Sequence, residues 1–200
     1  MFFPPATSRR VLKHSRVIEI EAYAREDNLW DIDARIRDIK TRDATLATGV
    51  RPAGMPIHDL GLRISINTNF DIIDAVAVSS AHPYPGYCDA ITPDYTKLIG
   101  LNLLRQFRHE VKLRLGGDRG CTHITELVQI LPTAAMQAFA GEVLQINEAI
   151  SANSSPNSSA ETSTEQDKQP FQLGRCHALK LTGGAVATYY PRWAKSADAT

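Results

Sequence analysis

The sequence predicts an α+β fold, an antiparallel sheet of two hairpins with helices packed on one face, followed by a C-terminal hairpin tail. Two observations lead to this fold class. The first 80 residues hold two pairs of segments in which apolar and polar residues alternate, each pair divided by a short polar turn. From about residue 92 the spacing changes to the period of a helix. Strands first and helices afterwards is the order typical of α+β domains.

The first hairpin is predicted over residues 15–24 and 29–39, with the polar "REDN" segment as its turn. Ile18, Ile20 and Ala22 share one face of the first strand. In the second strand the apolar residues point inward and the charged ones outward: Trp30, Ile32, Ala34 and Ile36 against Asp31, Asp33, Arg35 and Arg37. This alternation indicates a sheet with one solvated face.

Residues 41–57 lose the alternating period and contain Gly and Pro, so we expect a connecting loop. A second hairpin is predicted over residues 58–66 and 70–80, with "NTN" at its turn. Both faces of the 70–80 strand are apolar, which favours a central place in the sheet.

Three helices are predicted after the strands. Thr92 and Pro93 suit the N-cap and first position of a short helix through Ile99. The segment 101–117 has an apolar stripe and ends at a glycine pair; the stripe is Leu103, Leu104, Phe107, Val111 and Leu115. The last helix begins near Thr122 and reaches as far as Ile150, with a kink or break at Pro132.

Composition divides the chain into four parts. Residues 1–14 form a basic arm that includes His14, residues 15–150 form the α+β domain, and residues 151–169 lack apolar anchors and are expected to be a disordered linker. Residues 170–200 are expected to form a hairpin about Gly183-Gly184 that docks on the main domain, since two strands alone are marginally stable.

Charge and hydropathy exclude several classes of partner. Acidic and basic residues balance at 22 each without clustering, so no nucleic acid or anionic membrane is expected to bind. No segment is apolar enough to span a membrane and the first residues lack a signal peptide's apolar region. Three cysteines are too few for a disulfide framework, which favours a cytoplasmic protein with reduced thiols.

Potential metal ligands occur at four places in the sequence: His58 with Asp59, Cys88, Cys121 with His123 and Glu126, and Cys176 with His177. Most of these places lie where a strand or helix begins or a loop turns, so their side chains can converge in space. The unpaired amide groups at a helix start favour a thiolate at Cys121 and a neutral imidazole at His123, which are the ligand forms that zinc or iron requires. Glu126 lies on the same helix face as His123, so it could be a ligand itself or could orient a ligand.

Two other classes remain open. Cys121 could be a nucleophile activated by His123 or His58 and oriented by Asp59, although no nucleophile elbow or protease pattern accompanies it. Alternatively the cysteines are simply packed, and the protein is a structural or partner-binding module; a protein partner would find interface-type residues at Tyr189, Tyr190, Arg192 and Trp193. Cys88 and Cys176 are equally compatible with ordinary core positions.

Several longer segments resemble the bacterial family catalogued as domain of unknown function 2889. They are "REDNLWDIDARIRDIK", "PAGMPIHDLGLRISI", "PYPGYCDAI", "GGDRGCTHITEL", "CHAL" and "YYPRW". The resemblance extends over nearly the whole chain except the linker. It implies that these segments belong to one family and implies no mechanism.

A second resemblance concerns the order of elements over about residues 55–150, which is similar to the U-type iron-sulfur cluster scaffold fold. His58, followed by Asp59, stands at the position of that family's first cysteine, Cys88 at the second and Cys121 at the third. With only two thiolates at these positions, the resemblance implies a zinc or iron ion held by His58, Asp59, Cys88, Cys121 and His123 more readily than it implies cluster assembly.

Overall fold

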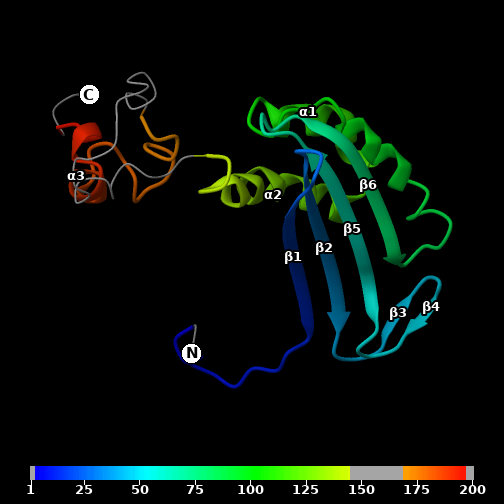
Figure 1. Ribbon diagram of the computed structural model, residues 1–200. Coiled ribbons are helices and arrows are strands. Elements are labelled where there is room, and N and C mark those ends of the chain that lie inside the picture. Colours follow the sequence, from blue (N-terminus) through cyan, green and yellow to red (C-terminus); the bar gives the residue numbers. More distant parts are fainter. Residues whose placement is uncertain (1–2, 145–168, 197–200) are drawn as a thin grey trace. The chain divides into compact units, whose positions relative to one another are not determined.

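The computed structural model describes residues 3–144 and 169–196. The chain forms two compact units, Met1–Gln137 and Ala138–Thr200. In order along the chain as far as Phe139, the elements are β1 (His14–Ala24), β2 (Trp30–Lys40), β3 (Ala44–Leu46), β4 (Gly49–Arg51), β5 (Pro56–Ile66), β6 (Ile72–Ala81), the 3-10 turn η1 (Thr92–Leu98), α1 (Phe107–Leu115), η2 (Gly117–Arg119) and α2 (Thr122–Phe139). Figure 1 shows these elements in sequence colours.

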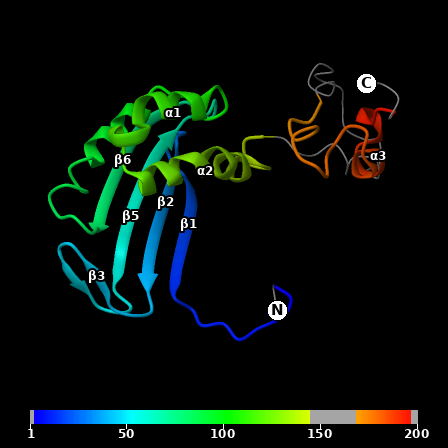
Figure 2. The same cartoon turned by 180° about the vertical axis from the view of Figure 1, so that it is seen from behind.

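Four strands form one antiparallel sheet in the order β1-β2-β5-β6, which confirms the predicted α+β fold class. Both predicted hairpins are present, as β1–β2 and β5–β6. One face of the sheet is covered by α1 and α2, which lie in front of the strands in Figure 2, while the opposite face faces the viewer in Figure 1.

The alternation in β2 decides which residues meet the helices. Ile32, Ala34 and Ile36 are buried on the covered face, while Arg35 between them is exposed on the other. The helices contribute fully or nearly fully buried side chains to the same core: Phe107, Val111, Leu115, Ile124, Leu127, Val128 and Leu131. Burial of this apolar area is the main stabilising contribution to the unit.

Three predicted features of the strand region differ in the structure. Residues 41–57 contain the small hairpin β3–β4, whose three-residue strands are too short to show a period, and they also contain the start of β5. The prediction of a central strand at 70–80 is wrong, because β6 is at the edge of the sheet. Val76 and Val78 on its uncovered face are 50% and 53% exposed.

The predicted helices are shorter than their sequence patterns. The first is a 3-10 turn, η1, whose N-cap is Ile91 and not Thr92. The helix predicted for 101–117 begins only at Phe107, because Gln106 before it has a left-handed φ of 49°. The last helix, α2, ends at Phe139 well before Ile150 and continues through Pro132 without a break. Burial of its apolar face outweighs the backbone hydrogen bond that a proline removes.

The second unit contains the helix α3 (Gly184–Tyr189) and the 3-10 turn η4 (Pro191–Trp193). The predicted hairpin about Gly183-Gly184 is therefore wrong. A tight hairpin turn of the predicted kind needs positive φ angles at its central glycines, whereas Gly183 has a φ of −93°. The predicted linker, residues 151–169, lies outside the described residues except for its last residue. Docking of the tail on the main domain stays a prediction.

In the described part of the chain, no helix combines the length and the apolar character needed to cross a lipid bilayer.

Candidate metal centre

A row of three polar side chains crosses the covered face of the sheet at one end. Arg16 on β1 is opposite Asp38 on β2, and Asp38 is opposite His58 on β5. Because alternate residues of a strand share a face, Asp38 continues the series of Ile32, Ala34 and Ile36 on the helix side. A carboxylate, an imidazole and a guanidinium are thereby brought side by side beneath α2.

Asp38 is the centre of this row. Its side chain is only 4% exposed, and it accepts hydrogen bonds from Arg16 Nε at 2.8 Å and Arg16 Nη2 at 2.9 Å. Nδ1 of His58 lies 3.1 Å from its Oδ2, and Nε2 of His14 lies 3.2 Å from its Oδ1. Burial by itself would raise the pKa of Asp38, but the hydrogen bonds and charge of Arg16 leave that pKa below its ordinary value. The carboxylate is therefore ionised at neutral pH.

The first turn of α2 adds a third imidazole, that of His123, beside those of His58 and His14. Nε2 of His123 lies 3.7 Å from Asp38 Oδ2. The ring of His123 stacks on the ring of His58, with centroids 3.8 Å apart and planes tilted by 31°. One ligand atom each from Asp38, His58 and His123 lie within 4.8 Å of one another, which is the spacing of groups that can share a metal ion.

The imidazoles of His58 and His123 are neutral at pH 7, because the pKa of each is below its ordinary value. The pKa of His58 is lowered by burial and by the neighbouring His123, against the opposing effect of Asp38. The pKa of His123 is lowered by burial and by the charge of Arg16. A neutral imidazole has the free lone pair that a metal ion requires, so the site needs no proton loss from either histidine at neutral pH.

The start of α2 is fixed by Tyr95 from η1. The Tyr95 hydroxyl accepts a hydrogen bond from the Cys121 backbone N–H at 3.0 Å and lies 2.9 Å from the Cys121 carbonyl and 2.8 Å from Thr125 Oγ1. Tyr95 is completely buried, and this burial raises its pKa to about 12. His123 lies between the two residues that Tyr95 contacts, so these hydrogen bonds hold the backbone from which its ring projects.

The structure brings together only some of the predicted site residues. His58 and His123 are adjacent, and Cys121 Sγ lies 4.0 Å from Nδ1 of His123. Glu126 is close as well, but its carboxylate accepts a hydrogen bond from Arg16 Nη1 at 2.6 Å and so orients the arginine.

The other predicted ligands are elsewhere. Asp59 follows His58 on β5, so its side chain lies on the opposite, uncovered face, where it pairs with Arg35 at 2.7 and 2.6 Å. Cys88 is in a turn after β6, where its N–H donates to the Tyr84 carbonyl, and it is not among the described residues that cluster about Asp38. Cys176 and His177 belong to the second unit.

Asp38, Arg16 and His14 were missed by the sequence analysis. A signal for Asp38 does exist in the sequence, because the inward series of even-numbered residues in β2 ends on a carboxylate. A charged residue at a position that faces the core requires partners, and this points to a polar site. His14 was assigned to the basic arm and Arg16 to the first predicted strand, and no sequence pattern indicated that their side chains meet Asp38.

Comparison with known proteins gives one finding. The model of the family described as "Protein of unknown function (DUF2889)" matches residues 14–137. The match includes every residue of the cluster about Asp38 and excludes the second unit, so it covers less of the chain than the sequence resemblance implied. Neither the curated proteins nor the solved structures gave a match, and the resemblance to the U-type iron-sulfur scaffold is not supported.

Proposed function

Because the chain belongs to the family of proteins of unknown function DUF2889, we propose its function from the site alone: it binds one divalent transition-metal ion, zinc or ferrous iron, through Asp38, His58 and His123. The observation that supports this is the convergence of one buried carboxylate and two imidazoles, from two strands and a helix, on a common point. The set of two histidines and one carboxylate is typical of catalytic zinc and of non-haem iron(II) sites.

The distances suit a metal ion. Ligands about 2.0–2.1 Å from a tetrahedral ion lie about 3.3 Å from one another. Asp38 Oδ2 lies 3.1 Å from His58 Nδ1 and 3.7 Å from His123 Nε2, which bracket that value. The three ligand atoms all lie within 4.8 Å of one another, which allows one ion to lie between them.

The protonation states of the two histidines suit a metal ion, whereas the positive charge of Arg16 opposes one. Without a metal ion, His58 Nδ1 can carry the ring hydrogen and donate it to Asp38. To bind an ion through Nδ1, His58 would take the other neutral tautomer, with the hydrogen on Nε2, and the charge of the imidazole would stay zero. Arg16 already neutralises Asp38, so the ion adds positive charge beside a guanidinium, which weakens binding. Glu126, paired with Arg16, offsets part of this excess.

A metal with three protein ligands retains a position for water or a substrate, at which it could act as a Lewis acid. His14 is the fourth group around Asp38 and the candidate to fill that position instead. The proposal places the protein in a reducing compartment, such as the cytoplasm, because Cys88, Cys121 and Cys176 are free thiols.

The test is metal analysis of protein purified without an affinity tag, followed by calorimetric titration of the metal-free protein with zinc and, without oxygen, with ferrous iron. We expect binding close to one ion per chain and a loss of at least tenfold in affinity for His123→Ala or His58→Ala. His109→Ala, which removes an exposed histidine of α1, is the matched control and should bind as the parent does. Absence of binding in the folded parent, or equal affinity in all variants, would reject the proposal.

A second candidate function, that of an enzyme with a cysteine nucleophile, is favoured by the position of Cys121 relative to His123 and Asp38. His123 lies between Cys121 and Asp38: its Nδ1 is 4.0 Å from Cys121 Sγ, and its Nε2 is 3.7 Å from Asp38 Oδ2. This is the order of a thiol, a base and a carboxylate that orients the base. In this alternative Cys121 is a nucleophile, and Asp38 takes the role that the sequence had suggested for Asp59. Fast labelling of Cys121 at neutral pH that a chelator does not change would favour the nucleophile, whereas labelling that speeds up only on chelation would favour the metal.

A further inference from the structure

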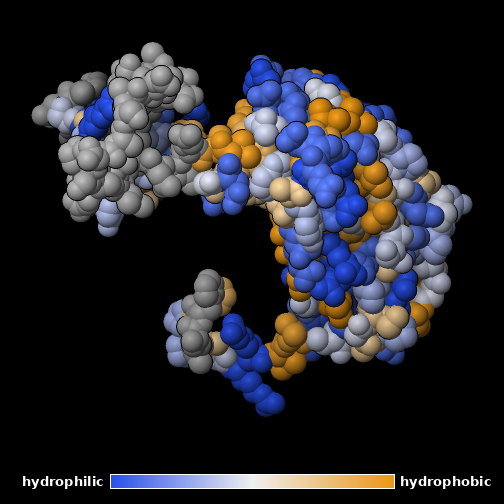
Figure 3. Space-filling view, in the orientation of Figure 1, coloured by the Kyte–Doolittle hydropathy of each residue, from blue (hydrophilic) through white to orange (hydrophobic). Residues whose placement is uncertain are grey.

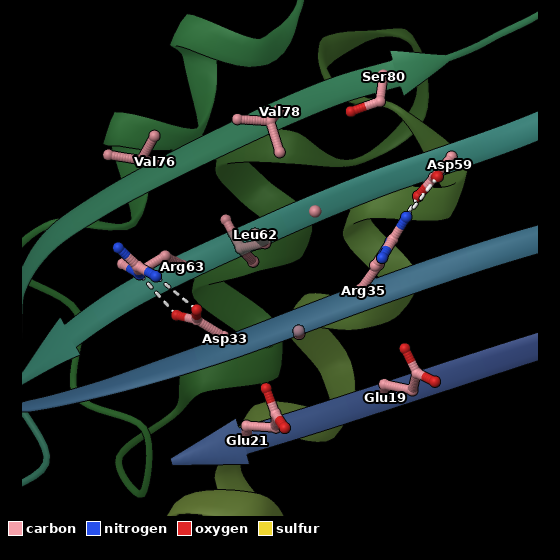
Figure 4. Close-up of a pocket in the computed structure, with 12 residues that line it drawn as sticks. Glu19, Glu21, Asp33, Arg35, Asp59, Leu62, Arg63, Val76, Val78 and Ser80 are labelled. Atoms are coloured by element: carbon pink, nitrogen blue, oxygen red, sulfur yellow. Dashed lines mark hydrogen bonds and ion pairs between the residues drawn. The ribbon is translucent and has the colours of Figure 1, made fainter. Parts of the chain in front are cut away.

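The uncovered face of the main sheet contains a shallow pocket of about 480 Å³ that is separate from the candidate metal centre. Figure 4 shows its lining from all four strands: Glu19 and Glu21 on β1, Asp33 and Arg35 on β2, Asp59 and Arg63 on β5, and Val76 and Val78 on β6. In the space-filling view of this face, hydrophilic side chains dominate and hydrophobic ones lie among them (Figure 3). The pocket thus has an acidic side at β1 and an apolar side at β6.

The charges within the pocket are not balanced. Two of its carboxylates are neutralised by bidentate salt bridges, Asp59 by Arg35 and Asp33 by Arg63. Glu19 receives one hydrogen bond from Arg37 at 3.0 Å. Glu21 accepts a hydrogen bond from the Tyr23 hydroxyl and has no basic partner among the residues that the structure describes. The acidic side therefore favours a cationic group.

The floor of the pocket depends on a glycine. Gly61 faces the uncovered side between the two Arg–Asp pairs, and a Cβ built there would lie 2.9 Å from Val78 Cγ2. Without that Cβ, Val76 and Val78 are left as an exposed apolar wall beside the charged residues. A ligand that fits this surface combines positive charge with apolar side chains.

The chain itself contains such a segment. In the N-terminal arm, defined here as residues 3–13, Arg9 and Arg10 are exposed and have no ion-pair partner in the described parts of the chain, 3–144 and 169–196. Val11 and Leu12 next to them are 64% and 65% exposed. The arm thus offers adjacent positive and apolar side chains in an extended segment.

The arm does not reach the pocket of its own chain. Thr41 Oγ1 donates to the Leu12 carbonyl at 2.9 Å, and the Thr41 N–H donates to the Lys13 carbonyl. These bonds direct the arm away from the sheet beyond the end of β2, as Figure 1 shows. They hold the arm at residues 12 and 13, next to Thr41.

We propose that the N-terminal arm of a second copy of this chain docks in the pocket on the uncovered sheet face, with Arg9 and Arg10 against Glu19 and Glu21 and with Val11 and Leu12 against Val76 and Val78. A reciprocal exchange of arms forms a weak homodimer. Exposed ion pairs contribute little individually and are screened by salt, so the dimer dissociates as the salt concentration rises.

The experiment is sedimentation equilibrium of the full chain over a wide range of concentrations at low and high salt. We expect a monomer–dimer equilibrium in the parent that is about tenfold weaker in Arg9→Glu/Arg10→Glu, since two exposed pairs are replaced by repulsion. Glu19→Lys/Glu21→Lys should weaken it similarly, and an equimolar mixture of the two variants should recover association. Glu26→Lys in the β1–β2 turn, outside the pocket, is the matched control and should associate as the parent does.

Three results would overturn the proposal: a parent that is monomeric at every concentration, a dimer that keeps its affinity in Arg9→Glu/Arg10→Glu, or variants of opposite charge that fail to associate when mixed. Circular dichroism of each variant verifies that the sheet is intact. The metal titration is independent of this test, because neither the arm residues nor the pocket residues belong to the cluster about Asp38.

Discussion

The imidazole rings of His58 and His123 lie with their centroids 3.8 Å apart, one on strand β5 and the other in the first turn of α2. Both rings lie beside the same oxygen of Asp38. Its Oδ2 is 3.1 Å from His58 Nδ1 and 3.7 Å from His123 Nε2. Folding thus joins a buried anion to two neutral bases.

Asp38→Asn should destabilise the metal-free protein by about 2–3 kcal/mol, because an amide cannot neutralise Arg16 and leaves this partly buried charge with only the more exposed Glu126 as its partner. The free energy of unfolding in urea measures the change. Asp33→Asn removes a carboxylate from the uncovered face of the same strand, where its pair with Arg63 is far more exposed, and should cost less than about 1 kcal/mol. Equal losses in the two variants would show that Asp38 has no special role in the fold.

Acid should weaken the metal-free protein between pH 7 and pH 5. His58 and His123 have pKa values below the ordinary one in the folded state, mainly because of burial, so the unfolded chain takes up protons first, near its pKa of about 6.5. The stability that they contribute is complete above that pH and decreases as the pH falls toward the folded pKa values. Asp38, whose pKa is also lowered, adds a loss only below about pH 4.

Urea unfolding with a chelator at both pH values measures this decrease. It should be smaller in His123→Gln, which removes one of the two titrating groups, and unchanged in the control His109→Gln. Stability that is constant or that rises on acidification would contradict the assigned directions of the pKa shifts.

Tyr95→Phe should cost about 1–2 kcal/mol in stability, since it leaves the Cys121 N–H and the Thr125 hydroxyl without the buried oxygen that they contact. The start of α2 then becomes less fixed, and zinc affinity should fall several-fold although no ligand is changed. Tyr23→Phe removes the hydroxyl of an exposed tyrosine on β1 and should alter neither quantity. A Tyr95→Phe variant that loses stability but binds zinc as the parent does would limit Tyr95 to a structural role.

Gly120→Ala should displace the start of α2. A Cβ at this position would lie 2.5 Å from the Leu115 carbonyl oxygen, a backbone atom that cannot move independently of α1. We expect a loss of about 1–3 kcal/mol and weaker zinc binding, because Cys121 and His123 follow directly. Gly184→Ala, where the added Cβ meets no atom within 4 Å, is the matched control. Unchanged stability of Gly120→Ala, measured by thermal unfolding, would show that the loop relaxes freely.

The sequence by itself determined the two hairpins and the α+β class, because alternation in β2 and β5 and helical spacing in α1 and α2 are local patterns that burial enforces. It also singled out His58 and His123, two residues that the fold does bring together. Two predictions that rested on local composition were wrong. The place of β6 in the sheet depends on the order in which the strands pair, and the predicted hairpin at Gly183 depends on the backbone conformation of that glycine.

Only the tertiary structure decided which carboxylate joins the two histidines. Asp59 is adjacent to His58 in sequence but points to the other face of the sheet, because successive residues of a strand alternate. Asp38 is distant in sequence, yet antiparallel pairing places it directly opposite His58 and Arg16. Residues 41–55 separate β2 from β5, so no tight turn fixes the register of these two strands, and the composition of the site became apparent only when β1, β2 and β5 were paired and α2 was laid across them.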